Sequence, residues 1–302
     1  MGIFKAIFAA TESMAQDQWK EFFYCNGIPN DILMVRGYKQ GNANANNGNP
    51  DVITEGSTIA VNEGQCAIVV SNGKVISIFT EPGEHEFRTG DTAGVFSGSS
   101  LKSFGKELGR RIYYGGDAPP IVQRVYYLNT KEILGINFGD SVGIPFRIFD
   151  ESRNLDIDCS LVTHGLFSFR ICDPAKIYKQ LMGNVTKVYD VTYLVTHMKT
   201  EVNSIIRDAA SKVLTGSYRP NDLSGQLPGI EKRVTETANE KLREVRGIEL
   251  VSLAFDTFRI TEKDSGLVRD VQRAAINKDT NMAAATIVGA TADAMINASN
   301  NQ

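Results

Sequence analysis

The stretch that decides the fold is VYYLNTKEILGINFG (Val125–Gly139), together with GLFSFRICDPAKIYKQLMGN (Gly165–Asn184) further along the chain. Both are rich in β-branched and aromatic residues as far as Ile171, which is typical of strands. Asp173 then offers a suitable helix N-cap, and Pro174 suits the first helical position. The sequence therefore predicts a change from strands to helices at this point.

Strand patterns extend on both sides of this region. In GSTIAVNEGQCAIVVSNGKVISIFTEPGEHEFRT (Gly56–Thr89), two β-rich runs flank the turn sequence Ser71–Lys74 and predict a hairpin. Residues 155–171 alternate between apolar and polar side chains, which predicts part of a long antiparallel hairpin with one buried face. We expect the preceding strands at Ile133–Ile136 and Ile144–Ile148.

The second half of the chain contains helical periodicity. Residues 190–214 and Ile230–Val245 carry apolar side chains at three- and four-residue intervals, which predicts two amphipathic helices with Val245 facing inward. Gly247 ends the second helix, and Ile248–Ile260 reads as a strand. Thr261–Asp264 resembles a capping box that begins a last, Ala-rich helix. This order of elements indicates an α+β fold.

The N-terminal residues 2–24 also follow a helical spacing, and their apolar side chains suit a helix that lies in a membrane interface. The candidate lipid contacts are Ile3, Phe4, Ile7, Phe8, Trp19, Phe22 and Phe23. The alternative is that this helix docks on the protein's own core or on a neighbouring subunit. The polar face is not basic, which on residues alone slightly favours the alternative.

Bulk composition excludes several classes of protein. A net charge of -3 and a pI near 5.8 argue against nucleic-acid binding, which needs a basic footprint, and against electrostatic adsorption to anionic lipid. No apolar run approaches the ~20 residues that cross a bilayer, and the first residues lack a cationic region typical of a secretory signal. The four cysteines form no CxxC pair, so we expect buried, reduced thiols.

Residues that could perform chemistry are scattered. The three histidines, His85, His164 and His197, form no metal-binding spacing, and there is no phosphate-binding loop and no GxSxG motif. Asp156 and Asp158 share one strand face and could bind a divalent ion, but a solvated strand face is more common and is our interpretation. We therefore expect no catalytic residues, no metal ligands and no cofactor.

The chain resembles the band 7 or SPFH (stomatin, prohibitin, flotillin) family over most of its length, and is most similar to a bacterial branch labelled "virion core protein-like". The strings that carry the resemblance are DQWKEFFYC (Asp17–Cys25), IAVNEGQCAIVV (Ile59–Val70), EPGE (Glu81–Glu84), RVYYLNTKEILG (Arg124–Gly135), RGIELVSL (Arg246–Leu253) and NMAAATIVGA (Asn281–Ala290).

This resemblance implies an N-terminal amphipathic helix (1–25), an SPFH domain of mainly antiparallel strands with packed helices (52–260) and a C-terminal oligomerisation helix (261–302). It implies a non-enzymatic scaffold that self-assembles and sits peripherally at the cytoplasmic face of the cell membrane. There it would organise membrane regions or recruit a phage-shock-type stress protein. The predicted oligomer contacts on the last helix are Leu267, Val271, Val288 and Met295.

The sequence also allows two alternative functions. A soluble oligomeric cage or adaptor would show the same assembly without lipid affinity, and an enzyme on a band 7-like core would need a concave site with perturbed titratable groups. Many members of the resembled branch continue into a four-cysteine zinc ribbon. The sequence ends at Asn301-Gln302 without one, so we expect either a short member or a truncated chain.

Overall fold

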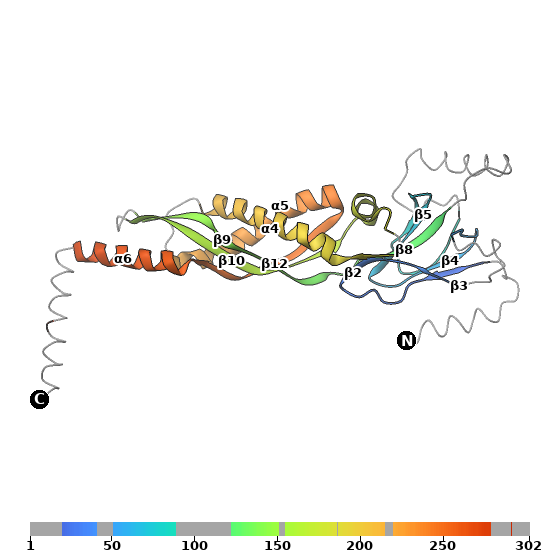
Figure 1. The fold of residues 1–302 in the computed structure, drawn as a ribbon, viewed down its shortest axis with the longest axis horizontal. Coiled ribbons are helices and arrows are strands. Elements are labelled where there is room, and N and C mark those ends of the chain that lie inside the picture. Colours follow the sequence, from blue (N-terminus) through green and yellow to red (C-terminus); the bar gives the residue numbers. More distant parts are fainter. Residues whose placement is uncertain are drawn as a thin grey trace, which may run out of the picture. The chain divides into compact units, whose positions relative to one another are not determined.

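The computed structural model describes residues 20–40, 51–88, 122–150, 155–185, 187–214 and 220–278, together with Thr291. The chain forms two compact units, each made of three separate segments. Unit 1 comprises Met1–Ile133, Phe169–Thr196 and Asn239–Glu249, and unit 2 comprises Leu134–Ser168, His197–Ala238 and Leu250–Gln302. Antiparallel sheets combine with packed helices, which confirms the predicted α+β class (Figure 1).

Unit 1 contains two β-sheets, of five and four strands. The first has the order β11-β2-β8-β5-β6, with strands β2 (Ile32–Arg36), β5 (Gln65–Ser71), β6 (Lys74–Phe79), β8 (Gln123–Asn129) and β11 (Val188–Asp190). The second has the order β3-β1-β4-β7, with strands β1 (Phe22–Tyr24), β3 (Tyr38–Gln40), β4 (Thr58–Val61) and β7 (Gly83–Glu86). The predicted turn at Ser71–Lys74 joins β5 to β6, which confirms the hairpin.

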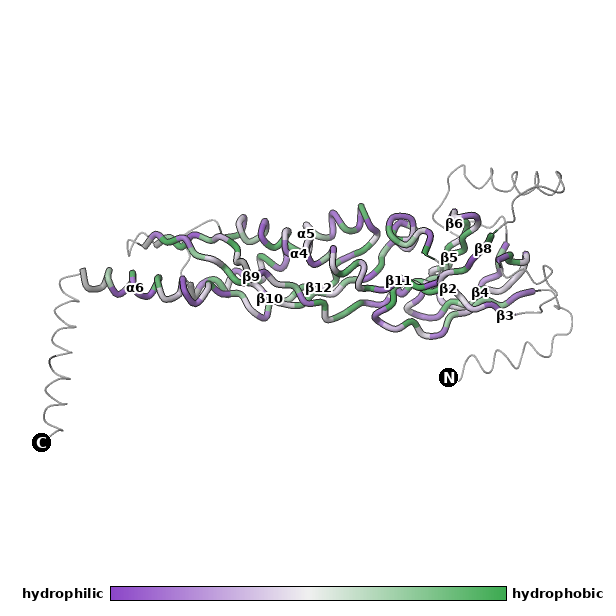
Figure 2. The backbone as a smooth tube through the Cα atoms, in the orientation of Figure 1, coloured by the Kyte–Doolittle hydropathy of each residue, from purple (hydrophilic) through white to green (hydrophobic). Residues whose placement is uncertain are grey.

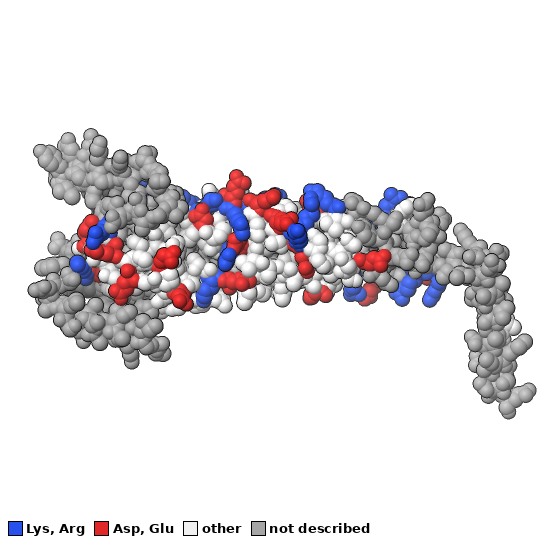
Figure 3. Space-filling model, turned by 180° about the vertical axis from the view of Figure 1, so that it is seen from behind, with Lys and Arg blue, Asp and Glu red and all other residues white. Residues whose placement is uncertain are grey.

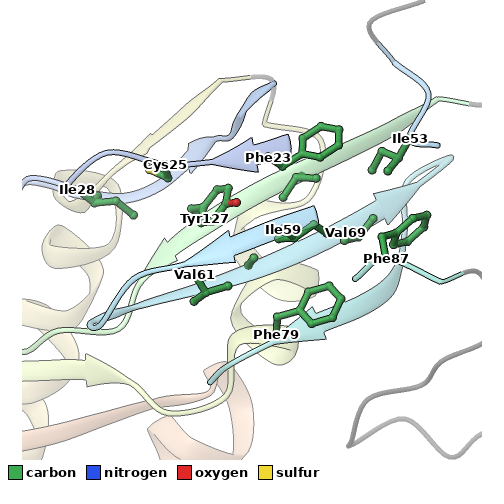
Figure 4. Close-up of a cluster of buried hydrophobic side chains, with 12 residues drawn as sticks. Phe23, Cys25, Ile28, Ile53, Ile59, Val61, Val69, Phe79, Phe87 and Tyr127 are labelled. Carbon is green, nitrogen blue, oxygen red and sulfur yellow. The ribbon is translucent and has the colours of Figure 1, made fainter. Parts of the chain in front are cut away.

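Side chains from both sheets meet in one hydrophobic core (Figure 4). Phe23 and Ile59 come from the four-stranded sheet, whereas Val69 and Tyr127 come from the five-stranded sheet. All seven residues of β5 are buried, in keeping with the nearly continuous apolar run in its sequence. Unit 1 is therefore a two-layered sandwich.

A short helical segment follows strand β10 (Leu155–Ile171) and contacts the end of helix α5 (Leu227–Arg246). It consists of α3 (Pro174–Ile177) and η3 (Tyr178–Met182), and the Asp173 carboxylate accepts a hydrogen bond from the Lys176 amide at 2.9 Å, as a predicted N-cap should. Gly247 has a φ of +69°, and a Cβ there would lie 2.5 Å from the Asp173 carbonyl oxygen. Only glycine fits this position between the end of α5 and the start of strand β12 (Ile248–Ile260).

The sheet of unit 2 has the order β12-β10-β9. Its strands are β9 (Ile133–Asp150), β10 (Leu155–Ile171) and β12 (Ile248–Ile260). The prediction of two separate strands at Ile133–Ile136 and Ile144–Ile148 is wrong, because β9 runs through both. Gly135 and Gly143 adopt positive φ angles of 74° and 85°, so the strand absorbs local irregularities without leaving the sheet.

Helices α4 (Val191–Val213) and α5 (Leu227–Arg246) lie along one face of this sheet, and η4 (Pro220–Gln226) precedes α5 (Figure 1). Hydrophobic and hydrophilic residues alternate along both helices (Figure 2). The predicted stripes are largely confirmed by the buried residues Leu194, Met198, Val202, Ile205, Ile206, Ala209, Ile230, Val234, Ala238 and Leu242. Val245 is an exception: it is 58% exposed, in the last turn of α5 next to the terminal Arg246.

Polar contacts fix the helices of unit 2 to its strands. The Arg207 guanidinium on α4 donates to the buried Asp140 carboxylate on β9 at 2.6 Å, and the Asn203 side chain donates to the Gly139 carbonyl at 3.0 Å. These contacts supply partners for polar groups that burial would otherwise leave unsatisfied.

The last described helix is α6 (Glu262–Lys278). The Asp264 amide donates to the Thr261 hydroxyl at 3.2 Å, which confirms one half of the predicted capping box. The other half differs, because the Asp264 carboxylate accepts from the Ser160 amide of β10 at 2.7 Å. The start of α6 is thereby tied to β10.

The prediction of a helix over residues 2–24 is wrong for its last three residues. Phe22–Tyr24 forms β1, which pairs antiparallel with β3 and parallel with β4. The aromatic residues of this tripeptide favour a strand, and the two neighbouring strands supply pairing that a helix would forgo. Residues 1–19 lie outside the described part of the chain.

Candidate functional site

Of the two carboxylates on one face of β10, Asp156 forms an exposed ion pair with Arg147. The Arg147 guanidinium donates to both oxygens of Asp156, at 2.7 and 2.6 Å, and Asp158 is exposed on the same face. These hydrogen bonds from Arg147 lower the pKa of the Asp156 carboxyl. The interpretation of a solvated strand face is confirmed.

The cysteine thiols differ in exposure. Burial raises the pKa of Cys25 to about 11, of Cys66 to about 12 and of Cys159 to about 11, so these thiols stay protonated and poorly nucleophilic at neutral pH. Cys172 is exposed, so the expectation that every thiol is buried is wrong for this residue. Cys172 directly follows the last residue of β10 and lies one residue before the Asp173 cap.

The three histidines lie on different elements of the fold. The His85 ring stacks on Phe79 with 4.9 Å between centroids, and its Nε2 lies 2.7 Å from the Glu81 carbonyl oxygen. Within the described ranges, no three His, Cys, Asp or Glu side chains are grouped so that they could hold a metal ion.

Unit 2 has a shallow hollow of about 490 Å³ where η4, the end of β12 and the start of α6 meet. Its lining residues are Leu223, Ser224, Phe258, Arg259, Ile260, Glu262, Ser265 and Arg269. The Arg259 guanidinium lies 3.5 Å from the Glu262 carboxylate, and Arg269 donates to the Ser265 carbonyl at 3.3 Å. Two guanidinium groups against one carboxylate give this rim a positive balance, which could accept an acidic side chain.

The predicted lipid contacts fall into two groups. Ile3, Phe4, Ile7, Phe8 and Trp19 lie outside the described residues. Phe22 and Phe23 lie on β1 and point to opposite faces of its sheet. Phe23 is 5% exposed and packs in the core of unit 1, so its assignment as a surface contact does not fit this structure (Figure 4).

Sequence reasoning missed an aromatic row on the face of β1 and β3 that points away from this core. The row consists of Phe22, Tyr24 and Tyr38, with ring centroids 6.1 Å apart for Phe22 and Tyr24 and 5.7 Å apart for Tyr24 and Tyr38. Tyr24 and Tyr38 are direct partners in the strand register. In a strand over Phe22–Tyr24 the first and third rings share one face, but neither this strand nor its pairing with Tyr38 could be inferred from spacing.

Two of the four predicted oligomer contacts lie among the residues that the structure describes. On α6, Leu267 is 49% exposed and Val271 is half-buried, whereas the intervening Val268 is 3% exposed. Leu267 and Val271 are four residues apart and therefore share one side of the helix. Val288 and Met295 lie outside the described residues.

Comparison with known families agrees with this architecture. Residues 47–283, well over half of the chain, match the SPFH domain-Band 7 family. The chain belongs to this family. The predicted family is thereby confirmed, while the narrower resemblance to one bacterial branch stays a prediction. No curated protein matches the chain.

The SPFH match covers the predicted oligomer contacts on α6 but none of the predicted lipid contacts. It includes β4 to β12 and α6, and hence Leu267 and Val271. It begins after β3, so the aromatic row lies before the matched segment. Among the described residues of this SPFH protein, no helix is both long and apolar enough to cross a membrane.

Proposed function

We propose that this SPFH protein is a non-enzymatic, self-assembling scaffold that binds a membrane peripherally. At the inner face of the cell membrane it would organise membrane regions or recruit stress-response partners of the phage-shock type. Family membership supports the scaffold role. The apolar residues at positions 3, 4, 7, 8 and 19 supply the candidate lipid contact.

Membership of the SPFH family over residues 47–283 is the observation that carries this proposal, and the structure adds how the chain enters unit 1 after Trp19. The Glu21 carboxylate, 1% exposed, pairs with Lys39 at 2.7 Å and accepts from the Thr54 amide at 3.0 Å. The Glu21 amide in turn donates to the Ser57 hydroxyl at 3.2 Å. Residue 21 is thus fixed to the sandwich, and any segment that holds Trp19 at a membrane is mechanically coupled to the whole of unit 1.

Self-assembly is supported by α6. A half-exposed Leu267 next to Val271 is an apolar stripe that a second helix could cover. The sequence that follows α6 is Ala-rich, and small residues suit close approach between helices. We infer that α6 packs against the same helix of another subunit.

The second candidate is a soluble cage or adaptor with the same assembly and no lipid affinity. Surface charge favours neither anionic lipid nor nucleic acid: basic and acidic side chains are interspersed on the face shown in Figure 3, and the described residues form no large basic area there. This candidate predicts that residues 1–19 contact protein rather than lipid.

Vesicle flotation of the full chain and of a chain lacking residues 1–19 tests the proposal. The deletion stops before Lys20 because removing Glu21 and β1 would disrupt unit 1 itself. We expect the full chain to float and the shortened chain to stay in solution with an unchanged melting temperature. If the full chain does not float, the membrane role is wrong and the soluble assembly is the better account.

Native mass measurements test assembly separately. A Leu267→Asp, Val271→Asp double variant places two charges in the proposed helix contact, and we expect it to dissociate the oligomer. The matched control is Arg273→Glu, an exposed position of the same helix that is six residues from Leu267. An unchanged mass for the double variant would exclude this side of α6 as the interface.

A further inference from the structure

The shallow hollow between η4, the end of β12 and the start of α6 serves neither the proposed lipid contact nor the proposed assembly. Leu223 and Ile260 line it as buried side chains. The Phe258 ring, also part of the lining, packs edge-on against Phe255 with 5.3 Å between ring centroids. The apolar lining is thus held in place by the fold, and the volume of about 490 Å³ lies within the range of about 300 to 1,000 Å³ typical of ligand pockets.

The rim of the hollow carries more positive than negative charge. The exposed Arg259 and Arg269 side chains line it, and Glu262 supplies the carboxylate among the lining residues. Arg259 meets Glu262 at 3.5 Å and Arg269 donates to the Ser265 carbonyl at 3.3 Å, which are long contacts for charged groups. Because a guanidinium has five N–H donors, these contacts leave donors on both groups for an incoming carboxylate.

The shape of the hollow favours a side chain presented by a peptide over a free small molecule. A pocket holds a small ligand tightly when it buries most of the ligand's surface. Here the rim stands in water, with Glu262 87% and Arg259 64% exposed. A peptide needs to place only one apolar side chain in the hollow as an anchor, and a neighbouring carboxylate can then accept two hydrogen bonds from a guanidinium.

We propose that this hollow binds an acidic peptide segment of a partner protein. An apolar side chain of the peptide would lie against Leu223, Phe258 and Ile260, with a nearby carboxylate on Arg259 or Arg269. This inference rests on the proposed scaffold role and deepens it by naming the chemistry of a recruited partner. It does not depend on lipid binding.

The hollow and the proposed assembly contact use different sides of α6. Glu262, Ser265 and Arg269 recur at three- and four-residue intervals and therefore share one side of the helix. Leu267 follows Ser265 by two positions, and Val271 follows Arg269 by two, which is about half a turn of an α-helix in each case. A peptide in the hollow therefore does not cover the side of α6 that is proposed to contact another subunit.

Selection from a library of short random peptides displayed on bacteriophage, with the full chain as target, tests the proposal. We expect the enriched peptides to combine a large apolar residue with Asp or Glu within a few positions. An Arg259→Gln, Arg269→Gln double variant should not enrich them. The inference is overturned if no peptide is enriched, if the enriched peptides lack acidic residues, or if both proteins select the same peptides.

The affinity for one enriched peptide, measured by fluorescence anisotropy, gives the size of the effect. The double variant should bind about tenfold more weakly, because two exposed ion pairs are lost, and its melting temperature should be unchanged. Lys263→Gln is the matched control, since it removes a positive charge from an exposed position in the first turn of α6 outside the lining. An equal loss of affinity in this control would mean attraction by overall charge and would overturn the site.

Native mass and vesicle flotation of the same proteins separate the possible failures. If the wild type assembles and floats but binds no acidic peptide, only this inference is wrong. If the wild type is a monomer that does not float, the proposed function is wrong, and with it this role for the hollow. A lower native mass for the double variant would assign the hollow to a second copy of the chain and overturn the proposal.

Discussion

Unit 1 and unit 2 each contain a buried carboxylate, and their surroundings differ. Glu21 in unit 1 is 1% exposed and is bound by the Lys39 ammonium, the Thr54 amide and, at 3.4 Å, the Ser57 hydroxyl. Asp140 in unit 2 is 6% exposed and pairs with the Arg207 guanidinium, which is itself 53% exposed. Glu21 thus joins strand β3 to the loop before β4, whereas Asp140 on β9 binds helix α4.

The two sites differ in the groups that would lose a hydrogen-bond acceptor if the carboxylate were removed. A backbone amide such as that of Thr54 cannot turn away, so it would be left buried without its acceptor. A half-exposed guanidinium can be hydrated instead. Stability should therefore depend more on Glu21 than on Asp140, although both are buried acids with a cationic partner.

Glu21→Ala should have the largest effect. We expect a loss of about 3 kcal/mol in the free energy of unfolding, because a buried ion pair and a buried amide lose their partner together. Urea unfolding measures the loss. Hydrogen exchange should accelerate in β1 and β4 of unit 1 and stay unchanged in β10 of unit 2.

Glu21→Gln sharpens this prediction, since its amide oxygen can still accept from Thr54 while the charge is absent. We expect it to recover part of the lost stability. Equal effects of Ala and Gln would mean that the pairing with Lys39, and not the Thr54 amide, accounts for the whole contribution.

Asp140→Ala should have a smaller effect, about 2 kcal/mol, because Arg207 can turn to solvent. Faster exchange should be confined to α4 and β9. If this variant proved as damaging as Glu21→Ala, the exposure of the cationic partner would not be what distinguishes the two sites.

Local sequence patterns predicted much of both units. The apolar stripe of α4 and the bounds of β12 follow from periodicities that a single segment carries. The Asp173 cap and the Ser71–Lys74 turn depend on residues next to one another in the chain. The family could also be recognised, because its matching strings are spread through the whole domain.

Long-range pairing could not be predicted in the same way. FFY at Phe22–Tyr24 is a strand because β3 and β4 flank it, and neither neighbour is visible in the local spacing. Glu21 is buried because Thr54 and Ser57 approach it from more than 30 residues away. The aromatic row has the same origin, so the sequence analysis counted the buried Phe23 as a surface residue and did not group Tyr38 with Phe22 and Tyr24.

Asp264 extends the comparison to a carboxylate that is only partly buried. Hydrogen bonds, first from the Ser160 amide and then with Thr261, lower the pKa of Asp264. A lowered folded-state pKa gives stability that is complete above the unfolded pKa of about 4 and is lost as pH falls through the folded value. Melting temperatures of the wild type and Asp264→Asn should differ most at neutral pH and converge below about pH 4.

Such convergence would show that the ionised carboxylate, and not its shape, ties α6 to β10. A difference that persisted unchanged down to pH 3 would instead assign the effect to packing at the start of the helix. Either way the effect should be smaller than that of Asp140→Ala, because solvent screens a partly exposed group.

Asp156→Ala should have the smallest effect, although its bidentate contact with Arg147 has the best geometry of the four carboxylates. Both side chains are more than half exposed, 63% for Arg147 and 53% for Asp156, so water replaces the lost partner on either side. We expect no change in urea midpoint beyond experimental error at physiological salt. A clear loss of stability would mean that the end of the β9–β10 hairpin depends on this pair, and hydrogen-bond geometry would then outweigh burial in ranking the carboxylates of this fold.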